Sequence, residues 1–225
     1  TLREISFVVD SISTLRPHVM AAVGGDIVVS PPSGVMAPVV PDLVGEMIAA
    51  DTFGADSIVV KDVESGAMLF RKNEYERQPI ASITKLMSAL VLLERPIDWA
   101  TTTVVVADEL SESHVQPGEV YTLDALWKIA LIGSSNRAIL TLADASGWPR
   151  EAFVARMNEK ARELGMADAV FVEPTGLDAG NMASAADVAL LLRAALAERK
   201  IQETVVMREF TALPTGGGPN HLWST

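Results

Sequence analysis

The spacing of apolar and polar residues changes along the chain and predicts strands before and after a helical middle. Short runs rich in β-branched and apolar residues at 57–62 and 67–71 predict two strands. The residues between them, Val63-Glu64-Ser65-Gly66, are typical of a turn, because Gly66 tolerates positive φ. We therefore expect a β-hairpin over 57–71.

Apolar residues at helical spacing predict the elements that follow. The first helix is expected from Ser82 to Glu94, where Arg95-Pro96 ends it, with Leu86, Leu90 and Leu93 on its apolar face. Further helices are expected at 122–131, 136–145, 149–165 and 184–199, and strands at 101–106 and 208–213. Because helices and strands occupy separate stretches, the pattern predicts an α+β fold.

Residues 1–53 differ from the rest. Two short β-branched runs, at 5–9 and 27–29, precede a stretch at 31–41 with four Pro and one Gly, which is typical of an extended linker. An apolar segment with a plausible helix start follows at 42–50. We predict that residues 1–53 are an extension or linker of unknown role, and that 54–225 form a separate domain.

Composition excludes several classes of protein. The 225 residues are 49% hydrophobic and contain no Cys, so the chain can bury a core but can form no disulfide, Cys-ligated zinc site or thiol nucleophile. With 18 basic and 29 acidic residues, the chain lacks the basic footprint of a nucleic-acid binder. Its three His residues show no metal-ligand spacing, so no metal site is expected. No apolar run reaches the roughly 18 residues of a membrane span, and any anchor would lie outside this chain.

Candidate chemistry begins with Ser82-Ile83-Thr84-Lys85 at the start of a predicted helix. Residues three apart share a helix face, so the Lys85 amine can reach the Ser82 hydroxyl. A serine needs an adjacent base to act as a nucleophile, and a lysine becomes such a base when burial or another cation lowers its pKa. Ser-x-x-Lys also occurs often by chance, so alone it is weak evidence.

Ser134-Ser135-Asn136 lies between two predicted helices. A loop serine can pass a proton, and the Asn136 amide can both donate and accept hydrogen bonds. The alternative is an ordinary helix cap, for which Ser and Asn are preferred. Arg137, which follows, is expected at the surface.

Together these two motifs resemble those of the active-site serine penicillin-recognising enzymes, and most closely the D-alanyl-D-alanine carboxypeptidases. The match is carried by the flanks of the first motif (80–89), by 133–138, and by Phe171-Val172-Glu173-Pro174-Thr175-Gly176-Leu177-Asp178, which is similar to a segment beside that family's active site. The resemblance runs from about 57 to 223. It implies a β-lactamase/transpeptidase-like fold, in which an antiparallel sheet backed by helices joins a helical subdomain.

The resemblance also implies a function. Ser82 would attack the D-Ala-D-Ala peptide bond of a peptidoglycan stem peptide, Lys85 would take its proton, Ser134 would pass a proton to the leaving group, and Asn136 would bind the substrate amide. β-Lactams would acylate Ser82 as inhibitors, and no cofactor or metal is required. The expected location is outside the cytoplasm, in the bacterial cell envelope.

The sequence departs from this family at two points. The third motif, Lys-Thr-Gly, is absent, so we expect a chain that stops before that strand and a sheet that is incomplete. Glu173 stands where the family often has Asn. Two alternatives therefore stay open: a β-lactamase in which Glu173 activates the deacylating water, and a non-catalytic cell-wall or β-lactam-binding module. Most exposed carboxylates contact only water, so a surface Glu before a turn is the plain interpretation.

Overall fold

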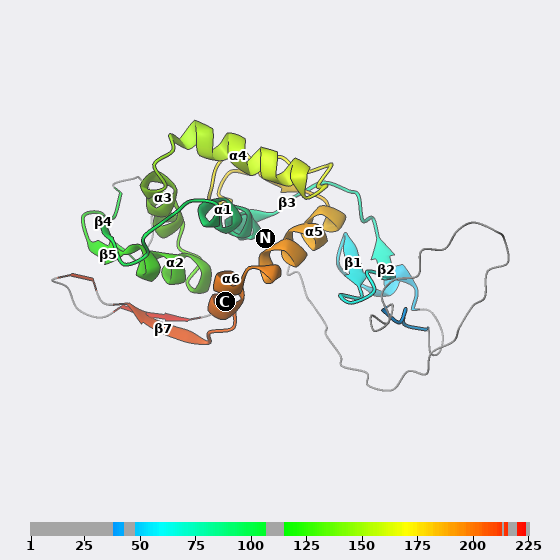
Figure 1. Ribbon diagram of the computed structural model, residues 1–225. Helices are drawn as coiled ribbons and strands as arrows, with labels where there is room; N and C mark the ends of the chain where they lie inside the picture. The colour runs from blue at the N-terminus through cyan, green and yellow to red at the C-terminus, as the bar shows by residue number, and fades with distance from the viewer. Residues whose placement is uncertain (1–37, 43–47, 107–114, 213, 216–219, 224–225) are drawn as a thin grey trace, which may run out of the picture. The chain divides into compact units, whose positions relative to one another are not determined.

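The computed structural model describes residues 38–42, 48–106, 115–212, 214–215 and 220–223. The chain divides into two compact units, Thr1–Asn73 and Glu74–Thr225 (Figure 1). The strands expected at 5–9 and 27–29 lie outside the described residues, as does most of the apolar segment at 42–50. Among the described residues, no helix combines the length and apolar character needed to cross a membrane.

The first unit contains the predicted hairpin. β1 (Ile58–Lys61) pairs antiparallel with β2 (Met68–Lys72), and a short 3-10 helix, η1 (Ala50–Thr52), precedes them. Gly66 has φ 71°, as the turn requires. The turn is held by Asp62, whose carboxylate accepts hydrogen bonds from the Ser65 amide (2.6 Å) and hydroxyl (2.5 Å). The Ser65 hydroxyl and amide lower the pKa of Asp62. The hairpin prediction is confirmed.

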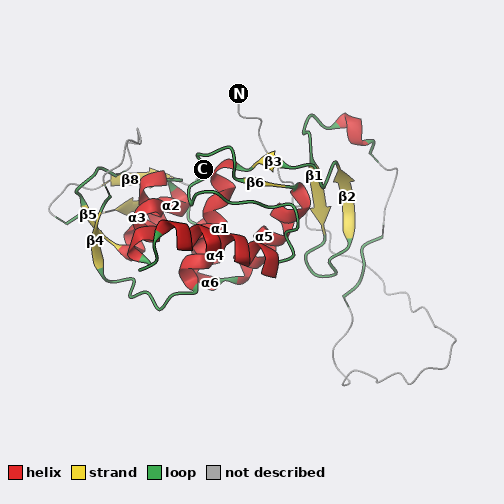
Figure 2. Cartoon of the chain, turned by 90° about the horizontal axis from the view of Figure 1, so that it is seen from above, coloured by secondary structure: helices red, strands yellow, loops and turns green. Residues whose placement is uncertain are grey.

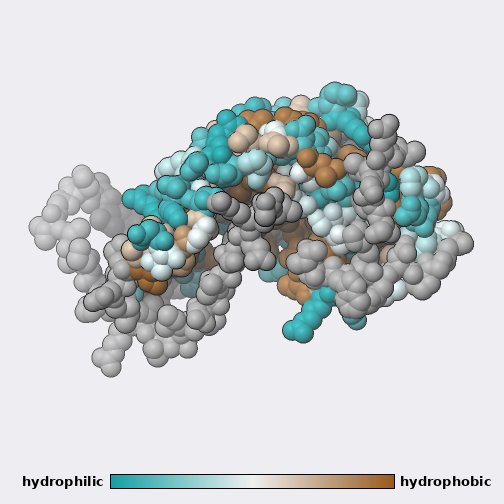
Figure 3. Space-filling model, turned by 180° about the vertical axis from the view of Figure 1, so that it is seen from behind, coloured by the Kyte–Doolittle hydropathy of each residue, from teal (hydrophilic) through white to brown (hydrophobic). Residues whose placement is uncertain are grey.

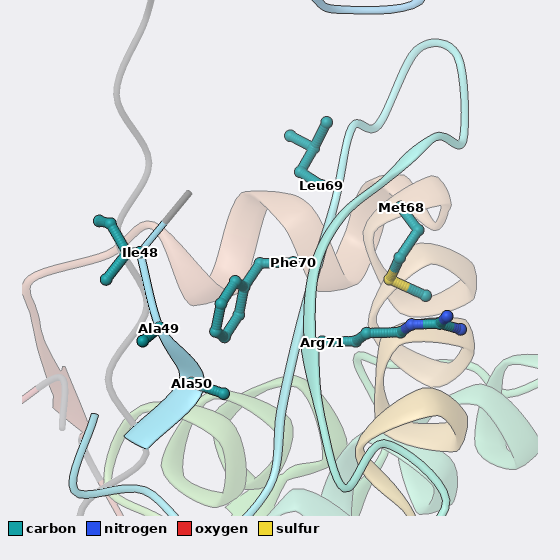
Figure 4. Close-up of a pocket in the computed structure, with 7 residues that line it drawn as sticks. All are labelled: Ile48, Ala49, Ala50, Met68, Leu69, Phe70 and Arg71. Atoms are coloured by element: carbon teal, nitrogen blue, oxygen red, sulfur yellow. The ribbon is translucent and has the colours of Figure 1, made fainter. Parts of the chain in front are cut away.

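An apolar hollow of about 410 Å³ lies between β2 and the segment before it (Figure 4). The Phe70 ring lies on the side facing Ala49 and Ala50, and it also packs edge-on against Phe53 at 5.2 Å between ring centroids. Lys72 Nζ ties the hairpin to the chain before it by donating to the carbonyl oxygens of Phe53 and Ala55. The lining carries little polar chemistry, so this hollow is no candidate for catalysis.

The second unit holds the helices. They are α1 (Thr84–Leu93), α2 (Leu123–Ile132), α3 (Asn136–Ala145), α4 (Arg150–Glu163), α5 (Ala185–Ala197) and α6 (Arg199–Val205), with a 3-10 turn, η2 (Ala81–Ile83), leading into α1. Thr122 and Ser184 cap their helices as predicted, and Ser184 forms a capping box with Asp187. The last predicted helix is in fact two, because extended backbone at Glu198 (ψ 112°) separates α5 from α6.

α1 lies at the centre of this unit and contacts α2, α3, α4 and α5 (Figure 1). The predicted single apolar face is wrong, since Leu86 and Leu93 are only half-buried. The most buried side chains are instead found around the helix, with Met87, Val91 and Leu92 all at 0% exposure. A helix that is enclosed on nearly all sides needs no polar face. Its position explains how Thr84, Lys85 and Ser88 come to be buried on it.

The strands of the second unit pair in twos. The pairs are β3 (Gln78–Pro79) with β6 (Met182–Ala183), β4 (Thr102–Val104) with β5 (Val120–Thr122), and β7 (Glu209–Ala212) with β8 (Asn220–Trp223). All are antiparallel, and β4–β5 and β7–β8 lie beside α2 (Figure 2). The α+β prediction with an incomplete sheet is confirmed. β3, β5, β6 and β8 were not predicted, because two to four residues show no readable period.

A network of ion pairs holds α4 against the end of α1. Arg156 contacts Glu94 (2.6 Å) and Glu163 (2.6 Å), and Lys160 also contacts Glu94 (2.9 Å). Hydrogen bonds from Arg156 lower the pKa values of both Glu94 and Glu163. Hydrophilic residues make up much of the upper surface where α4 lies (Figure 3).

Candidate active site

Ser82 lies on the 3-10 turn η2, between β3 and α1. The sequence predicted it as the first residue of a helix, and the structure places it one short turn earlier. Its side chain is exposed, while the next turn of chain is buried. The preceding residue, Ala81, has φ 45°, a conformation that costs an alanine about 1–2 kcal/mol. Such strain at a functional site is held by the surrounding structure, and here it presents the Ser82 hydroxyl to solvent.

Lys85 lies one turn further on and is 2% exposed. Its Nζ is 3.0 Å from Ser82 Oγ, as the three-residue spacing predicts. It also donates to Asn136 Oδ1 (2.7 Å) and to the carbonyl oxygen of Thr175 (2.9 Å). Burial removes the water that would otherwise stabilise a charged ammonium.

The second motif reaches Ser82 from the loop between α2 and α3. Ser134 has φ 54°, and its Oγ donates to Ser82 Oγ over 2.9 Å. Ser135 caps α3 by accepting from the Ala138 amide (3.0 Å), and Asn136 is the first residue of that helix. One residue of the motif thus acts as a cap, as the alternative interpretation proposed, while the other two face Ser82 and Lys85. All four predicted site residues come together.

A third contact was missed at the sequence stage of reasoning about individual residues. Thr175, which is 1% exposed, reaches Lys85 through its main-chain carbonyl. The neighbouring Gly176 (φ 92°) lies so close to the turn before Ser82 that a Cβ there would be 1.9 Å from Ala81 O. The 171–178 segment was recognised as lying beside the site, but a main-chain contact carries no side-chain signal.

The donors and acceptors around Lys85 suit proton transfer. A neutral amine has two N–H donors and one lone pair, whereas carbonyl oxygens can only accept. Thr175 O and Asn136 Oδ1 therefore take the two N–H groups and direct the lone pair at the Ser82 hydroxyl. Ser134 in turn contacts Ser82 Oγ from the other loop. The group has the nucleophile, base and proton-passing hydroxyl that acyl transfer requires.

Two expectations about single residues are corrected. Arg137 is not a surface residue: it is 3% exposed, and its Nη1 donates to the carbonyl oxygen of Val115 (2.6 Å). Glu173 is half-buried rather than a plain surface carboxylate, and it accepts hydrogen bonds from the amides of Thr175 and Gly176. A buried charge needs such partners, and the sequence alone did not reveal them. Among the described residues, no three His, Asp or Glu side chains gather as metal ligands would.

Comparisons with known proteins agree with this geometry. A family model described as D-alanyl-D-alanine carboxypeptidase matches residues 45–214. A D-alanyl-D-alanine endopeptidase of Pseudomonas aeruginosa is 38% identical over 141 residues, which are 60% of this chain and 46% of that protein. The chain thus spans about half the length of this relative.

Solved structures show the same fold. A D-alanyl-D-alanine carboxypeptidase of Mycobacterium tuberculosis matches with a TM-score of 0.68 and 30% identity, over 76% of this chain and 66% of the other. Penicillin-binding protein D2 of Listeria monocytogenes in its ampicillin-bound form matches with a TM-score of 0.66 and 27% identity, over 76% of this chain and 72% of the other. These matches confirm the fold expected from the motifs.

Proposed function

This chain belongs to the D-alanyl-D-alanine carboxypeptidase family, and from that membership we propose that it is part of a serine-type D-Ala-D-Ala carboxypeptidase acting on peptidoglycan stem peptides. The single observation that carries the proposal is the contact of Ser82 Oγ with both Lys85 Nζ (3.0 Å) and Ser134 Oγ (2.9 Å). A buried amine and a hydroxyl on one exposed serine are the minimum set for forming and breaking an acyl-enzyme.

In the first half of the reaction, Lys85 takes the Ser82 hydroxyl proton and Ser82 Oγ bonds to the carbonyl carbon of the D-Ala-D-Ala peptide. The C–N bond then breaks, and the proton returns through Lys85 and Ser134 to the departing D-Ala nitrogen. In the second half, water adds to the ester carbon, its proton passes to Lys85, and Ser82 Oγ leaves with a proton. Asn136 positions Lys85 and offers its amide N–H groups to the substrate.

β-Lactams would acylate Ser82 by the same first half, with the lactam C–N bond in place of the peptide bond. Support comes from the similarity to penicillin-binding protein D2, whose structure holds ampicillin. We further propose an extracytoplasmic location in the cell envelope, where peptidoglycan is found. Attachment to a membrane through a segment outside this chain stays a prediction. So does the division into an extension, 1–53, and a penicillin-binding domain, 54–225.

A second candidate is the D-alanyl-D-alanine endopeptidase activity, which cuts a cross-link between two stem peptides. The observation that favours it is the 38% identity to the Pseudomonas aeruginosa endopeptidase. Both activities use the same acyl-enzyme chemistry and differ in the leaving group. Purified cross-linked dimer and uncross-linked pentapeptide, offered separately, would distinguish them by product mass.

The test of the acyl-enzyme is intact mass after incubation with benzylpenicillin, using the protein expressed from its complete gene. We expect an increase of one penicillin on the wild type and none on Ser82→Ala. An unmodified wild type with a normal thermal transition would overturn the proposal and favour a non-catalytic wall-binding module. An adduct that disappears within seconds would favour a β-lactamase.

A further inference from the structure

The loop Glu173–Gly176 docks onto the Ser82–Ser88 segment through consecutive main-chain groups. The Pro174 carbonyl accepts from Ser88 Oγ (2.7 Å), and the next carbonyl, of Thr175, accepts from Lys85 Nζ (2.9 Å). Gly176 follows and packs against the turn at Ala81. The position of Lys85 therefore depends on how this loop is held.

Glu173 holds the loop from behind. Its Oε2 accepts from the Thr175 amide (2.6 Å), and its Oε1 accepts from the Gly176 amide (2.5 Å) and from Asn181 Nδ2 (2.7 Å). Asn181 is 0% exposed, and its Oδ1 accepts from the amides of Val172 (2.7 Å) and Glu173 (3.3 Å). The carboxylate and the Asn181 amide together fix both ends of the loop.

The Gly176 amide and the Thr175 carbonyl belong to one peptide group. A trans peptide is planar, with its N–H and C=O pointing in opposite directions. When Glu173 holds the N–H on one side, the C=O must point to the other, where Lys85 Nζ lies. The carboxylate also polarises this peptide group, because hydrogen bonds in series strengthen one another in a low-dielectric site.

We propose that Glu173 is a positioning residue, which orients and polarises the Thr175–Gly176 peptide so that its carbonyl holds Lys85 in line with Ser82. This inference rests on the proposed acyl-enzyme function of the same site. It differs from the β-lactamase alternative, in which Glu173 would activate the deacylating water. A carboxylate suits the position because it has two acceptor oxygens for two amides, whereas the side chains of Asn and Gln each have one.

The test compares Glu173→Ala and Glu173→Gln with Asp178→Asn. Asp178 is an exposed carboxylate on the same loop, and its Oδ1 accepts from the Gly180 amide (2.7 Å), so its substitution changes charge without touching the Thr175–Gly176 peptide. Stopped-flow acylation by a fluorescent penicillin separates the binding constant from the acylation rate. Thermal unfolding of each variant identifies any that fails to fold.

We expect the acylation rate to fall roughly tenfold to a hundredfold in Glu173→Ala, because small displacements of reacting groups cost about that much. Glu173→Gln keeps one acceptor and should fall between Ala and the wild type. The penicillin binding constant should change little in either variant. Asp178→Asn should match the wild type.

Two results would overturn the inference. If Glu173→Gln acylates normally but deacylates slowly, Glu173 serves the water and not Lys85. If both Glu173 variants fold and acylate as Asp178→Asn does, the contacts only brace the loop.

An NMR readout keeps this inference separate from the proposed function. The Gly176 amide and Lys85 Nζ resonances should both move in Glu173→Gln and stay in place in Asp178→Asn, whether or not penicillin reacts. A wild type that resists acylation but shows these shifts would contradict the function and support the positioning. A Lys85 resonance that does not move would contradict the positioning itself.

Discussion

Two loops meet the Ser82–Lys85 turn, and they do so with different parts of the chain. The loop at 133–136 contributes side chains, since Ser134 and Asn136 contact Ser82 and Lys85 directly. The loop at 173–176 contributes main chain, through the Thr175 carbonyl and the close approach of Gly176. Sequence motifs register the first kind of contact well and the second kind hardly at all. Substitutions in the two loops should therefore follow different rules.

In the side-chain loop, neighbouring serines should respond differently. Ser134→Ala removes the hydroxyl that contacts Ser82, and we expect penicillin acylation to fall about a hundredfold to ten-thousandfold, the usual range for proton transfer. Ser135→Ala removes only the cap on Ala138 and should cost about 1 kcal/mol of stability with acylation largely retained. Stopped-flow acylation and thermal unfolding measure the pair. Equal losses of acylation would contradict the separation of roles.

In the main-chain loop, the decisive side chain is one that is absent. Gly176→Ala would place a Cβ 1.9 Å from Ala81 O at φ 92°, and forced shifts of this kind cost about 1–3 kcal/mol in addition to the strain of positive φ. We expect a lower thermal midpoint together with slower acylation. Gly118→Ala is the matched control, since it has φ 87° but nothing within 4 Å of the added Cβ. If the two variants behave alike, the close approach at Gly176 is unimportant.

The α4 ion pairs provide a reference outside both loops. Arg156→Ala should destabilise the fold by no more than about 1 kcal/mol, because the pairs are partly exposed to solvent, and acylation should not change. Arg156 lowers the folded-state pKa of Glu94 below its ordinary 4.5, so this stabilisation is present above that value. It is lost as pH falls through the lowered pKa. Denaturant unfolding of both proteins at pH 7 and pH 3 should show the difference shrinking in acid.

The smallest effect is expected at Thr175 itself. Thr175→Val keeps the main-chain carbonyl on Lys85 and removes only the hydroxyl that accepts from the Leu177 amide (3.0 Å). We expect acylation within about threefold of the wild type and a stability loss near 1 kcal/mol, the usual value of one hydrogen bond. A hundredfold loss of acylation would mean that the Thr175 side chain takes part directly.

Much of this molecule follows from local pattern. The hairpin at 58–72 and the helix starts at Thr122 and Ser184 depend on interactions within a few residues, as do the helices α2 to α5. Spacing along one helix likewise brings Lys85 to Ser82. Family resemblance then paired this turn with Ser134 and Asn136, some fifty residues away, which spacing alone could not do.

Other features depend on contacts between distant segments. The burial of α1 on nearly all sides, and of Arg137 against Val115, follows from which elements pack around them. The short pairs β3–β6 and β4–β5 exist only because their partners are brought together by the helices.

The residue types at 82, 85, 134 and 136 specified the chemistry, because a nucleophile, a base and hydrogen-bonding groups are properties of side chains. The orientation of the Thr175–Gly176 peptide, and the part of Glu173 in holding it, were decided by the tertiary structure. Every residue carries the same N–H and C=O, so which carbonyl meets Lys85 is set only by how the chain returns to it.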